Sequence, residues 1–450
     1  MNPSQQLGEE KVGKLLLKFS IPAVIGMLVN GLYNIVDRIF VGRGVGSLAL
    51  SGIAISFPIT LAIMAFGMLI GIGATSVISI RLGQQKTEEA ERIVGNAFIL
   101  LLGISLTITL LGYLFMHPIL VGLGASPDVL PYAKQYISVL LGGAVFQSIG
   151  FGMNNFIRAE GNPKIAMYTM ILGAVLNTIL NPIFIFGMHL GVAGSALATV
   201  ISQFVTAVWV LYYFLGNRAL LKLRLQNFKL EWILVKDILA IGISPFSMQI
   251  VGSFVIVFLN KSLASYGGDL PIAAMGIITS IAMLIFMPIF GIGQGAQPIL
   301  GYNYGARQYD RVKQTLKLSV FAATSVMILG FLMVEFFPVP IMNLFSTDPE
   351  LIRVGANGMR IYLMMLPLIG FQVTAVGYFQ ATGKPRKSLF LSLARQLIFL
   401  APMIWILPKF LGLTGIWLAA PVSDLASAAL TAVWLYNDLK QLGQTRGPLR

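Results

Sequence analysis

Long runs of apolar residues recur from one end of the chain to the other, and no other sequence feature restricts the possible folds as strongly. Hydropathy windows of about 19 residues predict twelve membrane-spanning segments, at 14–41, 47–80, 93–116, 130–157, 165–187, 191–216, 237–260, 270–302, 314–337, 351–380, 388–408 and 413–436. Twelve spans of about 20 residues each would account for nearly all of the hydrophobic residues, which form 56% of the 450-residue chain. We therefore predict an all-α polytopic membrane protein with twelve transmembrane helices.

Basic residues are concentrated in alternate connections between these runs. Of the 31 Lys and Arg residues, seven lie in one set of connections, and the other 24 lie in the alternate set and the terminal segments. The seven are Arg38, Arg43, Lys134, Lys261, Arg353, Arg360 and Lys409. Because cytoplasmic connections carry an excess of Lys and Arg, the bias predicts that both termini are cytoplasmic. The net charge of +14 is then a signal of topology, and we expect no nucleic-acid partner.

Two rare residue types exclude several kinds of chemistry. The chain has no Cys, which excludes disulfides, Cys-ligated metals and thiol catalysis, and its two His residues do not form an HExxH motif. A membrane-embedded transferase would need a catalytic carboxylate pair or a metal motif near a loop, and the sequence offers neither. We therefore expect a protein that is not an enzyme and that has no resident cofactor.

Backbone-determining residues recur at an offset of about 222 residues, which indicates an internal duplication. The matching pairs include Gly73 and Gly295, Gly83 and Gly305, Pro118 and Pro340, and Pro127 and Pro349. Since each half holds an even number of spans, both halves would enter the membrane from the same side and form two pseudo-symmetric six-helix lobes around a cleft. We expect an N-terminal lobe at 1–216, a solvated cytoplasmic linker at 217–236 and a C-terminal lobe at 237–450. The prolines expected to be kinks or hinges are Pro22, Pro245 and Pro288.

Acidic residues at bilayer depth are candidates for function because inserting each one costs about 2.5–3.5 kcal/mol. Only Asp37 and Asp424 lie deep within the runs, and Asp37 shares a helix stripe with Asn30 and Asn34. Other polar pairs are Gln147 and Asn154 in the fourth run, Asn177 and Asn181 in the fifth, and Thr199 and Gln203 in the sixth. A buried carboxylate among amide and hydroxyl groups could exchange a proton, bind a hard cation such as Na⁺, or hold helices together.

The repeat is broken at these acidic positions. Asp37 matches Asn260 at an offset of 223, and Asp424 matches Gln203 at an offset of 221. The asymmetry predicts that ion coupling is concentrated in the N-terminal lobe. Asp424 would pair with Arg395 or bond to a neighbouring hydroxyl.

Three stretches of the sequence carry a resemblance to one transporter family. They are NIVDRIFVG at 34–42, LNPIFI at 180–185 and GAQPILGYNYGA at 295–306. The chain resembles the multidrug and toxic compound extrusion (MATE) family, with the bacterial DinF- and MepA-like transporters as the nearest branch. The resemblance implies antiport in a bacterial cytoplasmic membrane, with organic cations and other amphipathic toxic compounds leaving as H⁺ or Na⁺ enters. A flippase for a lipid-linked saccharide is the alternative, and we expect a monomer in the lipid bilayer.

The resemblance also assigns a coupling-ion site. The coupling-ion residues would be the first-helix acid Asp37, the fifth-helix Asn177 and Asn181, the sixth-helix Thr199 and the fourth-helix Tyr136. The polar stripes themselves, rather than the resemblance, provide the expected cleft residues, which are Asn30, Asn34, Gln147 and Asn154. The family's usual Leu-Asp-Pro is Leu-Asn-Pro at 180–182, so one of two lobe carboxylates is missing. We therefore expect coupling to H⁺ rather than Na⁺, and no metal site beyond a Na⁺ at Asp37.

Overall fold

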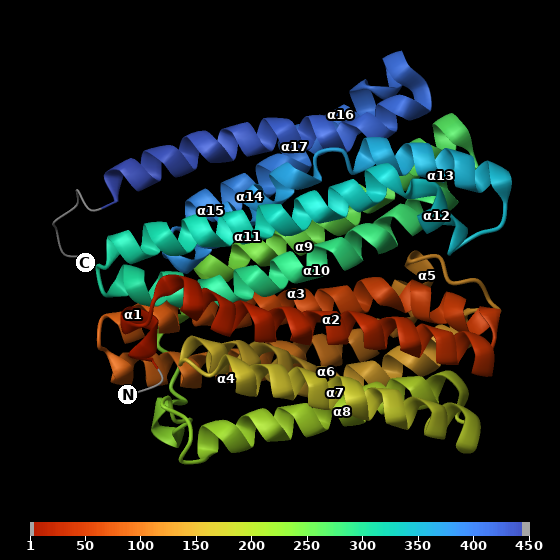
Figure 1. Ribbon diagram of the computed structural model, residues 1–450. Helices are drawn as coiled ribbons and strands as arrows, with labels where there is room; N and C mark the ends of the chain where they lie inside the picture. The colour runs from red at the N-terminus through yellow and green to blue at the C-terminus, as the bar shows by residue number, and fades with distance from the viewer. Residues whose placement is uncertain (1–3, 443–450) are drawn as a thin grey trace.

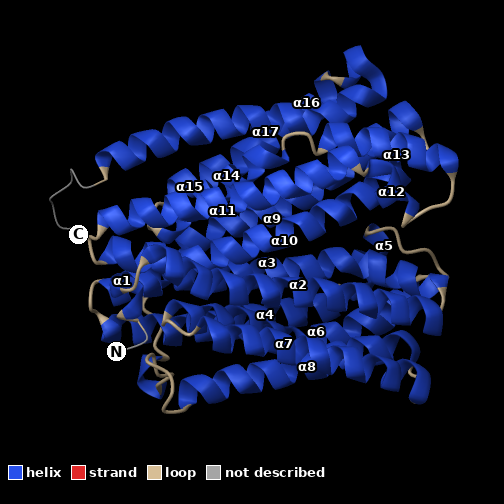
Figure 2. Cartoon of the chain, in the orientation of Figure 1, coloured by secondary structure: helices blue, strands red, loops and turns tan. Residues whose placement is uncertain are grey.

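The structure, a computed structural model, describes residues 4–442, and within that range its regular elements are all helices (Figure 2). Eleven of these helices are long and apolar enough to cross a membrane, and a bent pair adds a twelfth span. The first six spans are α2 (Val12–Gly44), α3 (Ser47–Gly83), α4 (Thr87–Leu114), α6 (Leu130–Ala159), α7 (Pro163–Pro182) and α8 (Gly191–Leu215). The last six are α9 (Trp232–Gly267), α10 (Asp269–Gly305), α11 (Tyr309–Phe336), α13 with α14 (Pro349–Tyr362, Leu366–Ala381), α15 with α16 (Pro385–Leu393, Ala401–Ile406) and α17 (Pro408–Gln441). The predicted polytopic all-α fold is confirmed.

Short helices lie outside the spans, and two of them follow the repeat. They are α1 (Gln6–Glu9), α5 (Met116–Gly122), α12 (Pro338–Asn343) and the 3₁₀ turn Leu225–Asn227. α5 and α12 begin 222 residues apart, as do the long helices α3 and α10. The duplication seen in the sequence therefore extends to the helix boundaries.

Two of the predicted spans are irregular within the C-terminal half. The run at 351–380 is two helices, α13 and α14, which are bent by 49° at their junction. Pro367 lies in the first turn of α14 and has no N–H to donate to the carbonyl of Leu363, so the helix cannot continue through this point. The run at 388–408 contains a π-helix, Ala394–Leu400, between α15 and α16. A π-helix also ends the fifth span, at Ile183–Gly187.

The two halves of the chain form separate lobes whose long helices run side by side (Figure 1). In this view the N-terminal lobe, coloured red to yellow-green, lies below the C-terminal lobe, coloured green to blue. α1 and the last turns of α17 lie at the same end of the molecule (Figure 1), which we call the terminal end. The predicted cytoplasmic location concerns the chain termini themselves, residues 1–3 and 443–450, which lie outside the described residues.

Glycines bring the two lobes into backbone contact near the terminal end. A Cβ added to Gly83 of α3 would lie 1.9 Å from the Tyr302 carbonyl oxygen of α10, and one added to Gly305 would lie 2.1 Å from the Ile80 carbonyl oxygen of α3. The contact is reciprocal, because Gly83 and Gly305 are repeat partners. No residue with a side chain fits such an approach without moving a helix. The recurring glycines therefore mark the place where the two lobes cross.

The segment between α8 and α9, predicted to be a solvated linker, is exposed on one side and packed on the other. Ala219, Leu221 and Leu223 are buried, whereas the alternating Arg218, Lys222 and Arg224 are exposed, so an extended chain lays one side on the N-terminal lobe. The alternation was visible in the sequence and is the physical reason for the packing. The helix α9 also begins at Trp232, inside the predicted linker 217–236, because the apolar run continues back to that residue.

Buried carboxylates of the N-terminal lobe fasten this segment. Glu160, between α6 and α7, accepts hydrogen bonds from the backbone N–H groups of Leu220 and Leu221, each at 3.1 Å, and from the hydroxyl of Tyr213. Glu91 accepts a 3.0 Å hydrogen bond from the N–H of Lys222. The connection between the lobes is therefore part of the N-terminal lobe.

Candidate functional site

The carboxylate of Asp37 lies between α2, α7 and α8. Asn181 Nδ2, on α7, donates to Asp37 Oδ1 over 2.6 Å, and Ser195 Oγ, on α8, donates to the same oxygen over 2.8 Å. Only 9% of the residue is exposed. Asp37 Oδ2 has no hydrogen-bond partner among the described residues. The anion is thus held by two uncharged donors, with its second oxygen open.

The donors belong to a hydrogen-bonded network between α7 and α8. Asn181 Nδ2 also donates to Asn177 Oδ1 over 3.0 Å, and Asn177 Nδ2 donates to Thr199 Oγ1 over 3.1 Å. Thr199 Oγ1 in turn donates to the backbone oxygen of Ser195 over 3.1 Å. The i, i+4 spacing places Asn177 and Asn181 on one face of α7, and Ser195 and Thr199 on one face of α8, so the two pairs can meet between the helices. The structure thus brings Asp37, Asn177, Asn181 and Thr199 together.

Ser195 is the residue that sequence reasoning missed. It is fully buried and contacts Asp37 directly. Its position four residues before Thr199 placed it on the same stripe of the sixth span, and this spacing was the signal that could have identified it.

The network offers oxygen atoms without a competing cation. Asn181 Oδ1 is buried and has no hydrogen-bond partner among the residues that the structure describes. The neighbouring Arg38 is exposed, and its guanidinium lies 5.6 Å from the centroid of the Phe57 ring rather than on Asp37. Among the residues described, Asp37 forms no ion pair. The site can therefore accept a proton or a small hard cation, because both bind to such oxygens.

Tyr136 and the four expected cleft residues do not join this network. Tyr136 is buried in α6, and within the described chain its hydroxyl makes no hydrogen bond to Asp37. Asn34 is exposed and donates over 2.7 Å to the backbone oxygen of Asn30 in its own helix. On α6, Gln147 is half-buried, whereas Asn154 is buried and its Oδ1 has no hydrogen-bond partner within residues 4–442.

The other deep acid, Asp424 of α17, has a charged partner. Arg395 Nε donates to Asp424 Oδ1 over 2.8 Å, and Ser423 Oγ donates over 2.8 Å to the backbone oxygen of Arg395. Of the two arrangements expected for Asp424, the structure has the ion pair. Asn260, the repeat partner of Asp37, is half-buried in α9. The two lobes therefore surround their deep carboxylates differently.

The three prolines expected to be hinges all lie inside long helices. Pro22 is in α2, Pro245 in α9 and Pro288 in α10. Each removes one hydrogen bond from its helix ladder. Pro22 and Pro245 are buried and related by the repeat, so they weaken equivalent helices of the two lobes.

Comparisons with known proteins agree with this architecture. The MatE family model matches the chain twice, at residues 22–183 and 245–406. The multidrug export protein MepA of Staphylococcus aureus (strain MSSA476) is 30% identical over 429 residues, covering 95% of this chain and 94% of that protein, and MepA of Staphylococcus haemolyticus is 28% identical with the same coverage.

Solved structures of transporters superpose on nearly the whole chain. The outward-facing conformation of a multidrug resistance MATE family transporter has a TM-score of 0.93 and 28% identity, and covers 98% of each chain. The MATE multidrug transporter DinF-BH, solved in complex with a ligand, has a TM-score of 0.90 and 40% identity, and covers 96% of this chain and 97% of its own. This chain therefore belongs to the multidrug and toxic compound extrusion family of membrane transporters, in its DinF- and MepA-like bacterial branch.

Proposed function

We propose that the protein exports cationic and other amphipathic drugs by antiport with H⁺, and that Asp37 carries the coupling proton. The observation that supports this most is the buried Asp37 carboxylate, held only by the neutral donors Asn181 and Ser195 and free of any ion pair within the described chain. A carboxylate in this setting can gain and lose its charge without breaking a salt bridge. That freedom is what an exchange of cations at one site requires.

The composition of the network favours H⁺ over Na⁺. Asp37 is its single acid, and Asn181 presents Nδ2 rather than an oxygen to Asp37. A Na⁺ ion would gain only one formal negative charge from this network. A proton needs only the open Asp37 Oδ2. The absence of the second family carboxylate therefore weakens the binding of H⁺ less than it weakens the binding of Na⁺.

Alternating access would require the terminal end of the lobe interface to open. Besides the glycine contacts, Gln297 Nε2 of α10 donates to Ser76 Oγ of α3 over 2.8 Å, and Arg311 Nη2 of α11 donates to the Glu10 backbone oxygen over 2.7 Å. The bias of Lys and Arg supports a cytoplasmic terminal end. Protonation of Asp37 and drug binding need only prefer different conformers by a few kcal/mol for export to follow.

The likeness to drug transporters supports the substrate class and the location. The relatives named above are multidrug export proteins, and the DinF-BH structure is that of a multidrug transporter with a ligand bound. We infer a multi-pass monomer in a bacterial cytoplasmic membrane, with no resident cofactor and no catalysis. These likenesses do not favour the alternative of a lipid-linked saccharide flippase.

Transport in proteoliposomes tests the proposal when ΔpH and ΔNa⁺ are imposed separately. Wild-type protein should move a fluorescent organic cation under ΔpH alone, and Asp37→Asn should abolish this movement although it folds, because the change is nearly isosteric. Asp269→Asn, in the exposed first turn of α10, is the matched control and should transport normally. Full activity of Asp37→Asn, or drive by ΔNa⁺ alone, would contradict the proposal.

A further inference from the structure

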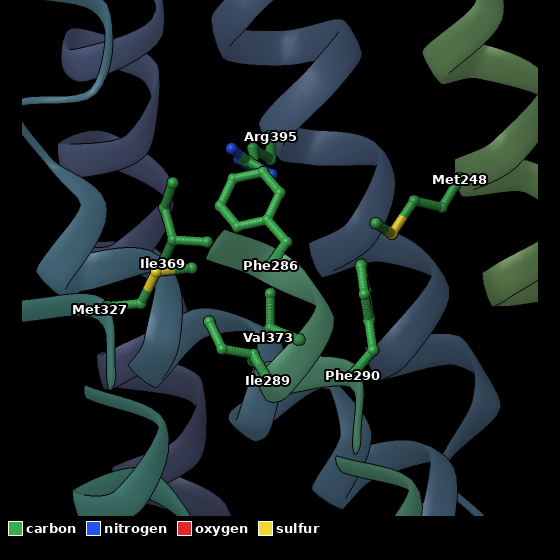
Figure 3. Close-up of a pocket in the computed structure, with 8 residues that line it drawn as sticks. All are labelled: Met248, Phe286, Ile289, Phe290, Met327, Ile369, Val373 and Arg395. Carbon is green, nitrogen blue, oxygen red and sulfur yellow. The ribbon is translucent and has the colours of Figure 1, made fainter. Parts of the chain in front are cut away.

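A cavity of about 240 Å³ lies at the terminal end, beside the crossing of α3 and α10. We call it the basic cavity, because its lining is polar and consists of Arg81, Gln84, Lys86, Tyr304, Gly305 and Arg307. A different cavity, inside the C-terminal lobe, is lined by apolar side chains and Arg395 (Figure 3), and its volume of about 50 Å³ holds only a few water molecules. Of the two, the basic cavity is the one with room for a ligand.

Positive charge exceeds negative charge around the basic cavity. Arg81 Nε lies 3.2 Å from Glu89 Oε2, and Lys86 Nζ lies 2.9 Å from Glu89 Oε1, so these two cations share one carboxylate. Asp237 is 3.9 Å from Arg81 Nη2. Arg307 is exposed, and its guanidinium makes no hydrogen bond or ion pair with any residue from 4 to 442. Three cations therefore meet two carboxylates, and Arg307 is the cation without a counter-charge.

Arg307 has a backbone conformation that glycine adopts more easily. Its φ is +59°, and its N–H donates to the Tyr304 carbonyl oxygen over 3.1 Å where α10 ends. Its repeat partner Gln85 follows the end of α3 with a φ of +63°. Glycine is the usual residue at such left-handed helix ends, because a Cβ is unfavourable there. The arginine side chain is therefore present in spite of a backbone cost, and only in the C-terminal lobe.

The lining of the basic cavity comes from both lobes. Arg81 is in the last turn of α3 and Lys86 precedes α4, whereas Arg307 follows α10. Close by, Gln85 Nε2 donates over 3.2 Å to the hydroxyl of Tyr302 across the same interface. A ligand in the basic cavity would thus add contacts across the end of the interface that alternating access has to open.

From this arrangement we propose that the basic cavity binds a phosphate group, with oxygens on Arg307 of one lobe and on Arg81 and Lys86 of the other, and that the bound group holds the terminal end closed. The donors belong to both walls of the cavity. A tetrahedral phosphate can accept from two sides, whereas the two oxygens of a carboxylate lie on one side. The planar fork of arginine also matches phosphate oxygens in pairs.

Two sources carry this chemistry, and one consequence follows for either. Inorganic phosphate and the headgroup of phosphatidic acid are both phosphate anions, and anionic lipids of the cytoplasmic leaflet attract basic segments. The consequence for export rests on the proposed function. A ligand that prefers the closed conformer makes its opening less favourable, by the difference between its affinities for the two conformers.

Titration calorimetry of inorganic phosphate into the detergent-solubilised full chain tests the cavity without transport. Arg307→Gly should weaken binding by about tenfold or more, the value of a lost charge-assisted hydrogen bond. The variant should fold, because glycine suits the left-handed position. Gln85→Gly makes the same backbone change outside the lining, and Lys164→Gln removes an exposed cation at the start of α7. Both controls should bind phosphate as wild type does.

A second arm identifies the source of the phosphate. Thermal unfolding is measured in nanodiscs of phosphatidylcholine with and without phosphatidic acid. Phosphatidic acid should raise the Tm of wild type and Gln85→Gly more than that of Arg307→Gly if the ligand is a lipid headgroup, whereas binding in detergent alone assigns a soluble anion. The proposal is overturned if neither probe binds through Arg307, or if Lys164→Gln weakens binding as much as Arg307→Gly, since attraction to net charge would then suffice.

Export assays separate this proposal from the proposed function. The phosphate probe that binds should slow ΔpH-driven export by wild type several-fold and leave Arg307→Gly unaffected. An unchanged rate at a saturating concentration of that probe would overturn the closing of the terminal end. Protein that binds phosphate through Arg307 but transports no drug would refute the export function alone.

Discussion

The two lobes each hold one deep carboxylate, and the difference between them is in the partners. Asp37 accepts hydrogen bonds from an amide and a hydroxyl, whereas Asp424 is paired with Arg395 at 2.8 Å. Both are largely buried. A carboxylate with neutral donors can change its charge, while one in an ion pair cannot do so without leaving a buried cation behind.

The comparison shows that the duplication preserved the arrangement of the helices but not the polar side chains around the deep carboxylates. Glycines and helix boundaries repeat at 222 residues, but the polar side chains do not. The donors of Asp37 show this clearly, because Asn181 and Ser195 are replaced at that offset by Met403 and Trp417. Conversely, Arg395 replaces Gly173. The deep carboxylates of the two lobes therefore have different partners on a common frame.

The largest expected effect is on stability, and it separates the two acids. Asp424→Asn should lower the free energy of unfolding by up to about 3 kcal/mol because it leaves the half-buried Arg395 guanidinium without its counter-charge. Asp37→Asn should cost far less, since it removes a charge that has no charged partner. Thermal unfolding of the purified variants in one detergent measures both. Adding Arg395→Gln to Asp424→Asn should restore most of the lost stability. If Asp37→Asn and Asp424→Asn destabilise the protein equally, the proposed difference between the two acids is wrong.

The fold followed from the sequence because a span is a property of about 20 residues together. Every predicted apolar run is helical. The prediction was reliable because a hydropathy sum over a window does not depend on any single residue. For the same reason the sums did not reveal the bend between α13 and α14 or the π-helix that carries Arg395. Local breaks depend on single residues such as Pro367, and a window average conceals them.

The candidate site was predictable where residues share one helix face and less so between helices. Spacing grouped Asn177 with Asn181 and paired Thr199 with Gln203. In the structure Asn181 bonds to Asp37 directly, and Asn177 and Thr199 are connected to it through Asn181. Ser195 lies four residues before Thr199 on the same face of α8, but its direct contact with Asp37 depends on how α8 packs against α2. Tyr136 came from family resemblance, and the geometry gives it no hydrogen bond to Asp37 within the described chain.

A third buried carboxylate sharpens the comparison because it lies outside the spans. Burial raises the pKa of Glu160 from its ordinary value of 4.5 to about 7, against the opposing hydrogen bonds from Tyr213 and the linker backbone. The folded state thus favours protonated Glu160, and this contribution to stability is fully present below pH 4.5 and is lost as pH rises through 7. The loss is on the order of 3 kcal/mol.

Unfolding measured between pH 5 and 8 tests this prediction. Glu160→Gln should flatten the dependence, whereas Glu88→Gln, an exposed glutamate at the start of α4, should leave it as in wild type. An unchanged pH profile in Glu160→Gln would show that the linker contact does not titrate in this range.

A smaller effect is expected at Thr199, which completes the Asp37 network. Thr199→Ala leaves Asn177 Nδ2 without its acceptor and costs about 1 kcal/mol, so ΔpH-driven export should fall by several-fold and remain independent of Na⁺. Thr178→Ala, which removes a hydroxyl bonded only to its own helix, is the matched control. Na⁺-dependent drug release at fixed pH that disappears in Thr199→Ala would replace H⁺ by Na⁺ as the coupling ion.

The smallest expected effect is the most direct test of asymmetry between the lobes. Moving the acid across the repeat, in Asp37→Asn/Asn260→Asp, should restore no export at all. Among the described residues the Asn260 side chain makes no hydrogen bond, whereas the Asp37 carboxylate accepts two. Lys261 is one residue further on and points about 100° away around the helix. The acid would thus lack the donors that let Asp37 carry a charge, while Asn260→Asp alone should leave transport largely intact. Recovery of ΔpH-driven export by the double variant would show that either lobe can couple, and the difference between Asp37 and Asn260 would then have no functional meaning.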